Sequence, residues 1–249
     1  MADILYSTVS KWQGEIHWGD VLDAGTGEQS LEWLLGLDTK SITAITGDPY
    51  RQSSMREKYS SQLRPQDQIL AENWLNHELF LDRQFDVVVA DYLLGALEGF
   101  APYFQTELFA RLKPHVRGFL YVIGLEPFSS EDRSDGAKII REIAALRDAC
   151  ILLAGHKPYR EYPRTWAIKQ LELAGYHVER SASFPILFGH RFVHGQLDVC
   201  KRKLYFMKDS NLIKGLDQHI EALRIRASDY IERNGKINFG SDYIIKSKA

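Results

Sequence analysis

The segment VLDAGTGEQSLEWL, residues 21–34, decides the predicted fold. A short apolar run ends at Asp23, Gly25 and Gly27 follow, and leucines at helical spacing begin directly after them. Glycines at such a turn let a ligand approach the backbone closely, and the free N–H groups at a helix start attract electron-rich groups. The segment therefore predicts a strand, a ligand-binding turn and a helix.

Strand-like and helix-like segments alternate along the chain around this turn. The strand-like segments are short and apolar, and they lie at residues 20–23, 41–46, 68–71, 85–90 and 119–124. The clearest of them, FDVVVA, is β-branched and apolar enough for a strand that is covered on both faces. The alternation predicts an α/β fold with a doubly wound, mostly parallel sheet.

Further candidate binding residues follow the next three strands. Asp48 comes directly after the second strand, where a carboxylate can accept both hydroxyl groups of a ribose. Asn73 and Trp74 follow the third strand and offer an amide for an adenine edge and a ring for stacking. Asp91 and Tyr92 end the fourth strand. Because ligands of open α/β sheets bind beyond the carboxyl ends of the strands, we expect one site here.

These residues together resemble class I S-adenosylmethionine-dependent methyltransferases. The resemblance covers residues 18–128, and strands at 177–184 and 241–246 would complete a Rossmann-like, seven-stranded sheet. It implies that S-adenosyl-L-methionine is the cofactor and assigns each binding role. The methionine part would face Asp23, Ala24, Gly25, Thr26 and Gly27, the ribose Asp48, the adenine Asn73 and Trp74, and the methyl group Asp91 and Tyr92. The segment Arg111–Pro114 is similar to the L-K-P-G-G stretch of the family.

The turn departs from the family pattern and also admits a rival interpretation. Gln29 stands where the family often has a third glycine, and Asn73 stands where it usually has an acidic residue. The rival is a nicotinamide-dependent enzyme, which needs a G-x-G-x-x-G turn. Ser30 occupies the last position of that motif, which favours the methyltransferase.

The composition is that of an ordinary globular protein. The chain has 249 residues and a formal net charge of −2, whereas nucleic-acid binders usually carry a basic excess. The N-terminus shows no signal peptide, and the apolar stretch at residues 85–97 is broken by Asp86 and Asp91. Cys150 and Cys200 have no metal or redox spacing. We therefore expect a cytoplasmic protein with no metal and no membrane partner, and the charge argues against a nucleic-acid partner.

Two groups of residues are candidates for contacting the substrate. In the segment 156–163, Tyr159, Arg160 and Tyr162 offer hydrogen bonds and a carboxylate clamp, although a plain surface loop is the alternative. His190 and His194, together with Asp198, recur every four residues and would share one face of a helix. They could form a metal-binding face, supply a base or contact the substrate, but the glycines at 189 and 195 make a regular helix doubtful there.

The predicted organisation has four parts. Residues 1–17 form an N-terminal helix and candidate lid, 18–184 the cofactor-binding core, 185–240 a helical insertion that covers the substrate, and 241–249 the final strand. The expected function is methylation of a nitrogen or oxygen nucleophile on a small molecule. A protein or peptide acceptor and a catalytically inactive cofactor-binding subunit are the alternatives. The helical pattern at residues 212–231 is either a packing face or the surface of a homodimer.

Overall fold

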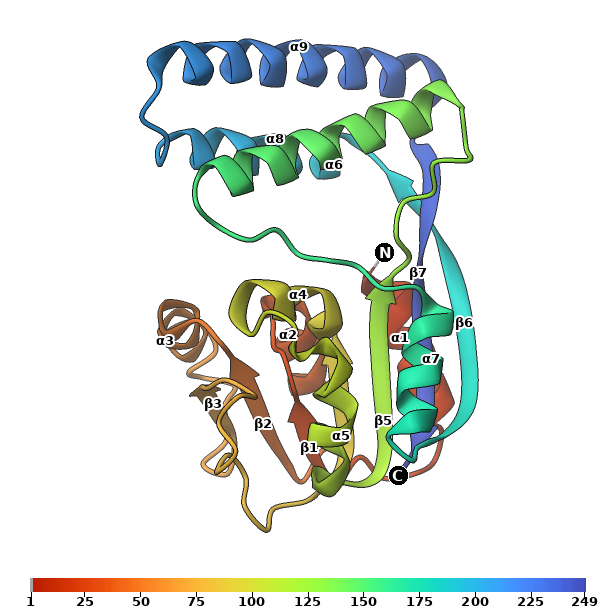
Figure 1. Cartoon of the computed structure of the whole chain (residues 1–249). Coiled ribbons are helices and arrows are strands. Elements are labelled where there is room, and N and C mark those ends of the chain that lie inside the picture. Colours follow the sequence, from red (N-terminus) through yellow and green to blue (C-terminus); the bar gives the residue numbers. More distant parts are fainter. Residues whose placement is uncertain (1) are drawn as a thin grey trace. The chain divides into compact units, whose positions relative to one another are not determined.

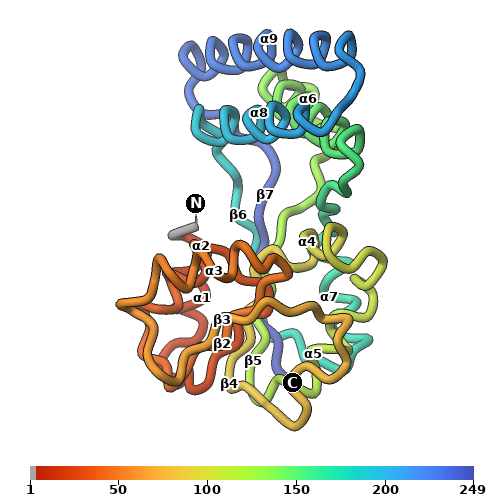
Figure 2. Tube along the Cα trace, turned by 90° about the vertical axis from the view of Figure 1, so that its left-hand side faces the viewer, coloured from red at the N-terminus to blue at the C-terminus, as the bar shows by residue number. Residues whose placement is uncertain are grey.

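The computed structural model describes residues 2–249, with side chains from Ile4 onward. The described residues form two compact units. The first, the core unit, contains the chain up to Glu126, Tyr159–Phe184 and Asp242–Ala249. The second, the helical unit, contains Pro127–Pro158 and Pro185–Ser241. The chain trace through both units can be followed in Figures 1 and 2.

The strands of the described residues form one sheet in the order β3-β2-β1-β4-β5-β7-β6 (Figure 1). Their bounds are β1 Asp20–Asp23, β2 Ser41–Thr46, β3 Gln68–Ala71, β4 Phe85–Asp91, β5 Val116–Leu125, β6 His177–Phe188 and β7 Ile237–Lys248. The first five strands pair in parallel, and β7 pairs antiparallel with β5. The predicted seven-stranded, mostly parallel sheet is confirmed. Because the strand order reverses between β1 and β4, a ligand crevice is expected at their carboxyl ends.

Helices cover both faces of this sheet, as a doubly wound fold requires. One face carries α1 (Ala2–Gln13), α2 (Glu28–Leu35) and α3 (Pro49–Lys58), whose buried side chains belong to the same core cluster as Val87 and Val89. The other carries α4 (Leu93–Phe100), α5 (Leu108–Leu112) and α7 (Arg164–Leu173), whose buried side chains belong to the same core cluster as Val88 and Ala90. Successive residues of β4 thus point to opposite faces, and both faces are buried. Two short 3₁₀ turns, η1 (Phe104–Thr106) and η2 (Lys113–His115), flank α5.

The helical unit consists mainly of α6 (Asp135–Leu153), α8 (His190–Leu204) and α9 (Ser210–Asn234). Each helix buries an apolar stripe at helical spacing, for example Ile139, Ile143 and Leu146 of α6. α8 packs against both other helices, and α8 is regular across Gly195, where the sequence left a helix doubtful. Burial of Val193, Leu197 and Cys200 outweighs the intrinsic cost of one glycine, which is about 1 kcal/mol.

The boundary of the core differs from the predicted one at α6. Residues 127–158 group with the helical unit, whereas the sequence placed all of 18–184 in the core. The physical reason is the partner of the apolar stripe, because α6 buries it against α8 and α9 instead of against the sheet. No helix of the described residues has the length and apolar character needed to cross a membrane.

Candidate functional site

The glycine turn joins β1 to α2 at the switch point of the sheet. Its backbone is held by neighbouring strands: the N–H of Ala24 donates to Val89 at 2.8 Å and that of Thr26 to Ile45 at 2.6 Å. A side chain at Gly25 would collide with Leu93, since its Cβ would lie 2.7 Å from Cδ1. A Cβ at Gly27 would meet nothing within 4 Å. The turn is therefore packed from behind at Gly25 and faces open space at Gly27.

Asp23 ends β1 directly below this turn and is fully buried. Its Oδ2 accepts a hydrogen bond from Ser30 Oγ at 2.7 Å. Its Oδ1 is buried and has no hydrogen-bond partner among the described residues. Burial raises the pKa of Asp23 to about 6, against the opposing effect of the nearby polar groups of Ser30, Thr26 and Gly25. A buried carboxylate oxygen without a partner is costly unless a cation or donor is supplied.

Asp91 ends the neighbouring strand β4, and it too has one carboxylate oxygen without a hydrogen-bond partner in the described part of the chain. Its Oδ2 accepts a hydrogen bond from the Tyr6 hydroxyl at 2.8 Å, whereas its Oδ1 is buried without a partner among residues 4–249. Burial, followed by the charge of Asp23, raises the pKa of Asp91 to about 7. Tyr6 comes from α1 and stacks on Trp33 of α2 with ring centroids 4.8 Å apart. The N-terminal helix thus reaches the predicted site.

Tyr92 and Asp242 lie next to Asp91 and add a hydroxyl and a third carboxylate to the candidate site. Tyr92 adopts a left-handed backbone conformation with φ 48°, at the point where β4 turns into α4. It hydrogen-bonds Asp242 of β7, and burial raises the pKa of both groups, that of Asp242 to about 6. Asp242 was missed by the sequence analysis. The available signal was a single carboxylate at the start of the otherwise apolar run DYII.

Asp48 and Asn73 lie at the ends of β2 and β3, as predicted. Asp48 begins α3, where its Oδ1 accepts from the N–H groups of Tyr50 at 2.9 Å and Arg51 at 3.3 Å, while Oδ2 takes no part in this cap. The Asn73 amide donates to the Phe100 carbonyl at 2.9 Å. The Phe100 ring is 42% exposed and is pressed against the backbone at Gly47, where an added Cβ would lie 2.6 Å from it. Phe100 is an aromatic surface that the sequence analysis missed.

The prediction that Trp74 stacks on an adenine is not supported by the structure. The ring is 2% exposed and lies inside the core cluster, with the Phe80 ring 6.3 Å away. Its indole N–H donates to the carbonyl of Ala24 at 2.7 Å. Trp74 therefore supports the glycine turn from the core side and presents no free ring face for stacking.

The segment with Tyr159, Arg160 and Tyr162 lies against α4 within the core unit. The N–H of Arg160 donates to the Gly95 carbonyl at 3.2 Å, and the Tyr159 ring lies beside Gly99. Tyr162 is half-buried against Trp166, with ring centroids 4.4 Å apart. Two glycines four residues apart share one helix face and allow this close approach, a signal that the sequence analysis did not use. The segment is therefore held against α4, the helix that begins directly after Tyr92.

His190 and His194 belong to the helical unit. Both lie on α8 with their rings 5.8 Å apart, and His194 Nε2 is 3.1 Å from Ser228 Oγ. Asp198 makes an ion pair with Arg224 at 2.8 Å instead of facing the histidines as a ligand would. No group of three His, Cys, Asp or Glu side chains in the described part of the chain is placed to hold a metal ion. A substrate-contacting role for either histidine stays a prediction.

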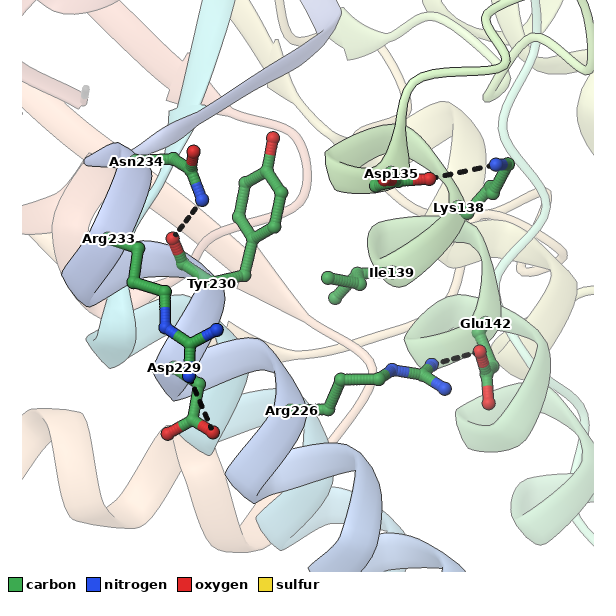
Figure 3. A pocket seen from close by; sticks show the side chains of 9 residues that line it. All are labelled: Asp135, Lys138, Ile139, Glu142, Arg226, Asp229, Tyr230, Arg233 and Asn234. Carbon is green, nitrogen blue, oxygen red and sulfur yellow. Dashed lines mark hydrogen bonds and ion pairs between the residues drawn. The ribbon is translucent and has the colours of Figure 1, made fainter.

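The helical unit also contains a cavity of about 450 Å³ between α6 and α9 (Figure 3). Its charged groups pair with one another across and along the helices. Arg226 pairs with Glu142, Lys138 with Asp135 at 2.8 Å, and Arg233 with Asp229 at 4.0 Å. Because cations and carboxylates balance, the lining does not favour a ligand of either charge.

Comparison with known proteins identifies the fold. No family model matches the chain, and no curated protein matches it in sequence. A candidate methyltransferase from Bacillus halodurans is similar in structure, with a TM-score of 0.61, 14% identity, and coverage of 98% of this chain and 97% of that one. A mycolic acid cyclopropane synthase complexed with SAH and CTAB has a TM-score of 0.60 and 12% identity, with 99% and 84% coverage.

A third similar structure is a coclaurine N-methyltransferase bound to N-methylheliamine and SAH. It has a TM-score of 0.56 and 10% identity, and the match covers 100% of this chain and 72% of that one. The chain therefore has the class I methyltransferase fold that the sequence resemblance predicted. At such low identity the likeness concerns the fold alone, so function must be argued from the site.

Proposed function

We propose that this chain is an S-adenosylmethionine-dependent methyltransferase that acts on a nitrogen or oxygen nucleophile of a small molecule. The observation that carries the proposal is the pair of buried carboxylates, Asp23 and Asp91, each with one oxygen that lacks a partner among residues 4–249. They lie at the ends of β1 and β4, the two strands that flank the switch point. S-adenosylmethionine carries an ammonium and a sulfonium, so it offers the positive charge that these oxygens lack.

The surrounding residues fit the remaining parts of the same molecule. Asp48 Oδ2 is not used in the cap of α3 and is suited to ribose hydroxyls. The partly exposed ring of Phe100, next to Gly47 and Asn73, replaces Trp74 as the proposed adenine-stacking surface. When bound, S-adenosylmethionine would supply an electrophilic methyl group. The protein then has to position the acceptor and exclude water.

The chain's own residues suit these two tasks. Tyr6 brings α1 over Asp91 and supports the predicted lid role of this helix. An acceptor that starts protonated must lose a proton as its new bond to carbon forms. The Asp242 carboxylate, held beside Tyr92 and with its pKa raised to about 6, is a base that can accept that proton near neutral pH. A small acceptor is favoured by the compact, near-neutral chain.

Calorimetric titration with S-adenosylmethionine and S-adenosylhomocysteine tests the proposal. Asp48→Ser retains a side chain that caps α3 but removes the carboxylate, so both compounds should bind about tenfold or more weakly with the fold unchanged. Asp38→Ser, at an exposed aspartate, is the control and should bind as the wild type does. If the wild type binds neither compound, the proposal fails and nicotinamide cofactors should be tested next.

The second prediction concerns the acceptor. Alanine at both Tyr159 and Arg160 should lower turnover at least about tenfold while the affinity for S-adenosylmethionine stays unchanged, since the segment rests on α4 and not on the turn. The measurement is transfer of labelled methyl groups to fractionated small-molecule extracts, alongside the titration. Unchanged turnover would remove this segment from the acceptor site. Cofactor binding without transfer to any fraction would favour the inactive subunit instead.

A further inference from the structure

One end of the helical unit exposes an unusual number of large apolar side chains. This end, here called the tip, comprises residues 151–158 after the main part of α6 and residues 201–214, which link α8 to α9. The exposed side chains are Tyr205 at 88%, Leu152 at 59%, Phe206 at 54%, Leu153 at 49% and Leu212 at 39%. Exposed apolar side chains scattered singly are normal, but several at one place indicate an interaction surface.

The structure brings the two segments of the tip together. The ring of His156 meets the ring of Phe206 edge-on, with centroids 5.0 Å apart, and Tyr205 lies beside Phe206 at 5.6 Å. Figures 1 and 2 both show the last turns of α6 and α8 side by side, with the start of α9 next to them. The two segments of the tip therefore lie together, although they are far apart in the sequence.

The tip is also strongly basic. Its residues include six Lys or Arg and one acidic residue, Asp209, in a chain whose net charge is −2. Asp209 is engaged in capping α9 through the N–H groups of Asn211 and Leu212. Lys201 pairs with Asp217 and Glu221, but Arg202 and Lys208 are exposed, and Lys203 lies over the Phe206 ring. Basic residues at helix C-termini favour the helix dipole, which explains part of the charge but not the exposed rings.

We propose that the tip binds the surface of an anionic phospholipid bilayer. Tyr and Phe suit the boundary between headgroups and acyl chains, the leucines suit the acyl region, and the basic residues suit anionic headgroups. A nucleic acid would use the rings and cations but not the exposed leucines, since neither bases nor phosphates attract them. A second copy of the chain would bring two basic tips together, which their charges oppose.

This proposal goes beyond the methyltransferase function and does not depend on it. It replaces the sequence-based expectation that the chain has no membrane partner. That expectation rested on the lack of a spanning segment, which does not describe a local surface assembled by folding. Peripheral binding through a few aromatic and basic side chains needs no spanning helix.

Vesicle flotation of the full chain tests the proposal. The wild type should float with phosphatidylcholine vesicles that contain phosphatidylglycerol, and less with pure phosphatidylcholine or at high salt. Arg202→Gln with Lys208→Gln should weaken binding about fivefold for each charge removed. Tyr205→Ser with Phe206→Ser should weaken it at least about tenfold. Tyr50→Ser removes an equally exposed tyrosine from α3 of the core unit and should leave binding unchanged.

Other outcomes would overturn the proposal. Failure of the wild type to float with anionic vesicles, or equal flotation with neutral ones, contradicts lipid recognition. Binding that survives the Tyr205 and Phe206 substitutions places the contact elsewhere. If polyuridylate RNA binds through these residues while vesicles do not, the partner is a nucleic acid. Dimers in light scattering that the same substitutions dissolve would show that the tip is a subunit interface.

Discussion

Replacing Asp91 with asparagine should weaken binding of S-adenosylmethionine about 100-fold and, at the same time, make the cofactor-free protein more stable above pH 7. Asparagine has nearly the same shape and can still accept the hydrogen bond from Tyr6. It cannot carry the negative charge that the proposed cofactor requires. It also cannot carry the charge that is buried at a cost when the cofactor is absent.

The direction of the pH dependence follows from the raised pKa values. Burial raises the pKa of Asp91 from 3.8 to about 7 and that of Asp23 to about 6. An acid whose pKa is raised by folding keeps its proton to a higher pH in the folded state than in the unfolded state. Its contribution to stability is therefore full below about pH 4 and is lost as the pH rises to about 7. The neutral amide of Asp91→Asn has no such loss. Across this pH range the free energy of unfolding of the variant should therefore rise relative to that of the wild type, by about 1 to 3 kcal/mol.

Two measurements check this prediction. Urea unfolding of the cofactor-free proteins between pH 5 and pH 8 should show the stability difference widening with pH, and calorimetry should show affinity of the wild type rising over the same range. Asp38→Asn, at an exposed position, is the control for both. A variant that is less stable than the wild type at pH 8 would mean that Asp91 has a structural cation or donor partner, which contradicts its assignment to a binding site.

The sheet and the position of the candidate site could be predicted because their signals are local. The β-branched run of β4 fits a strand covered on both faces, and the glycine turn follows β1 within a few residues. In a parallel sheet these local signals also place the polar residues at a shared edge. The positions of Asp23, Asp48 and Asp91 at or just after the ends of strands could therefore be predicted from the sequence. The class I fold follows from the same alternation.

The features that the sequence could not predict are the contacts of individual side chains. Trp74 was expected to face a ligand, but its orientation depends on the core cluster and on the carbonyl of Ala24, 50 positions away. Tyr6 reaches Asp91 across 85 positions, and Asp242 reaches Tyr92 from the last strand. No periodic pattern encodes such pairs. The apolar stripe of α6 likewise predicts a buried helix face without telling whether a sheet or another helix covers it.

The same substitution at Gly25 and at Gly27 should damage the protein in two different ways. At Gly25 the added Cβ would lie 2.7 Å from Leu93 Cδ1 and 3.0 Å from its Cβ, so alanine should destabilise the protein by about 1 to 3 kcal/mol. At Gly27 nothing lies within 4 Å, and φ −119° with ψ 174° is extended backbone that alanine and valine also adopt. Alanine there should cost less than about 1 kcal/mol, through the weaker helix cap.

Cofactor binding should respond in the opposite order. If S-adenosylmethionine fills the space at Gly27, Gly27→Ala should weaken its binding about tenfold and Gly27→Val more than about 100-fold, because each added methyl group occupies the ligand's position. Gly25→Ala should bind within a few-fold of the wild type under conditions where it is folded. Thermal unfolding and calorimetry on the three variants separate the two effects. Wild-type affinity in Gly27→Val would show that the open side of the turn is not where the cofactor lies, even if binding itself were proven.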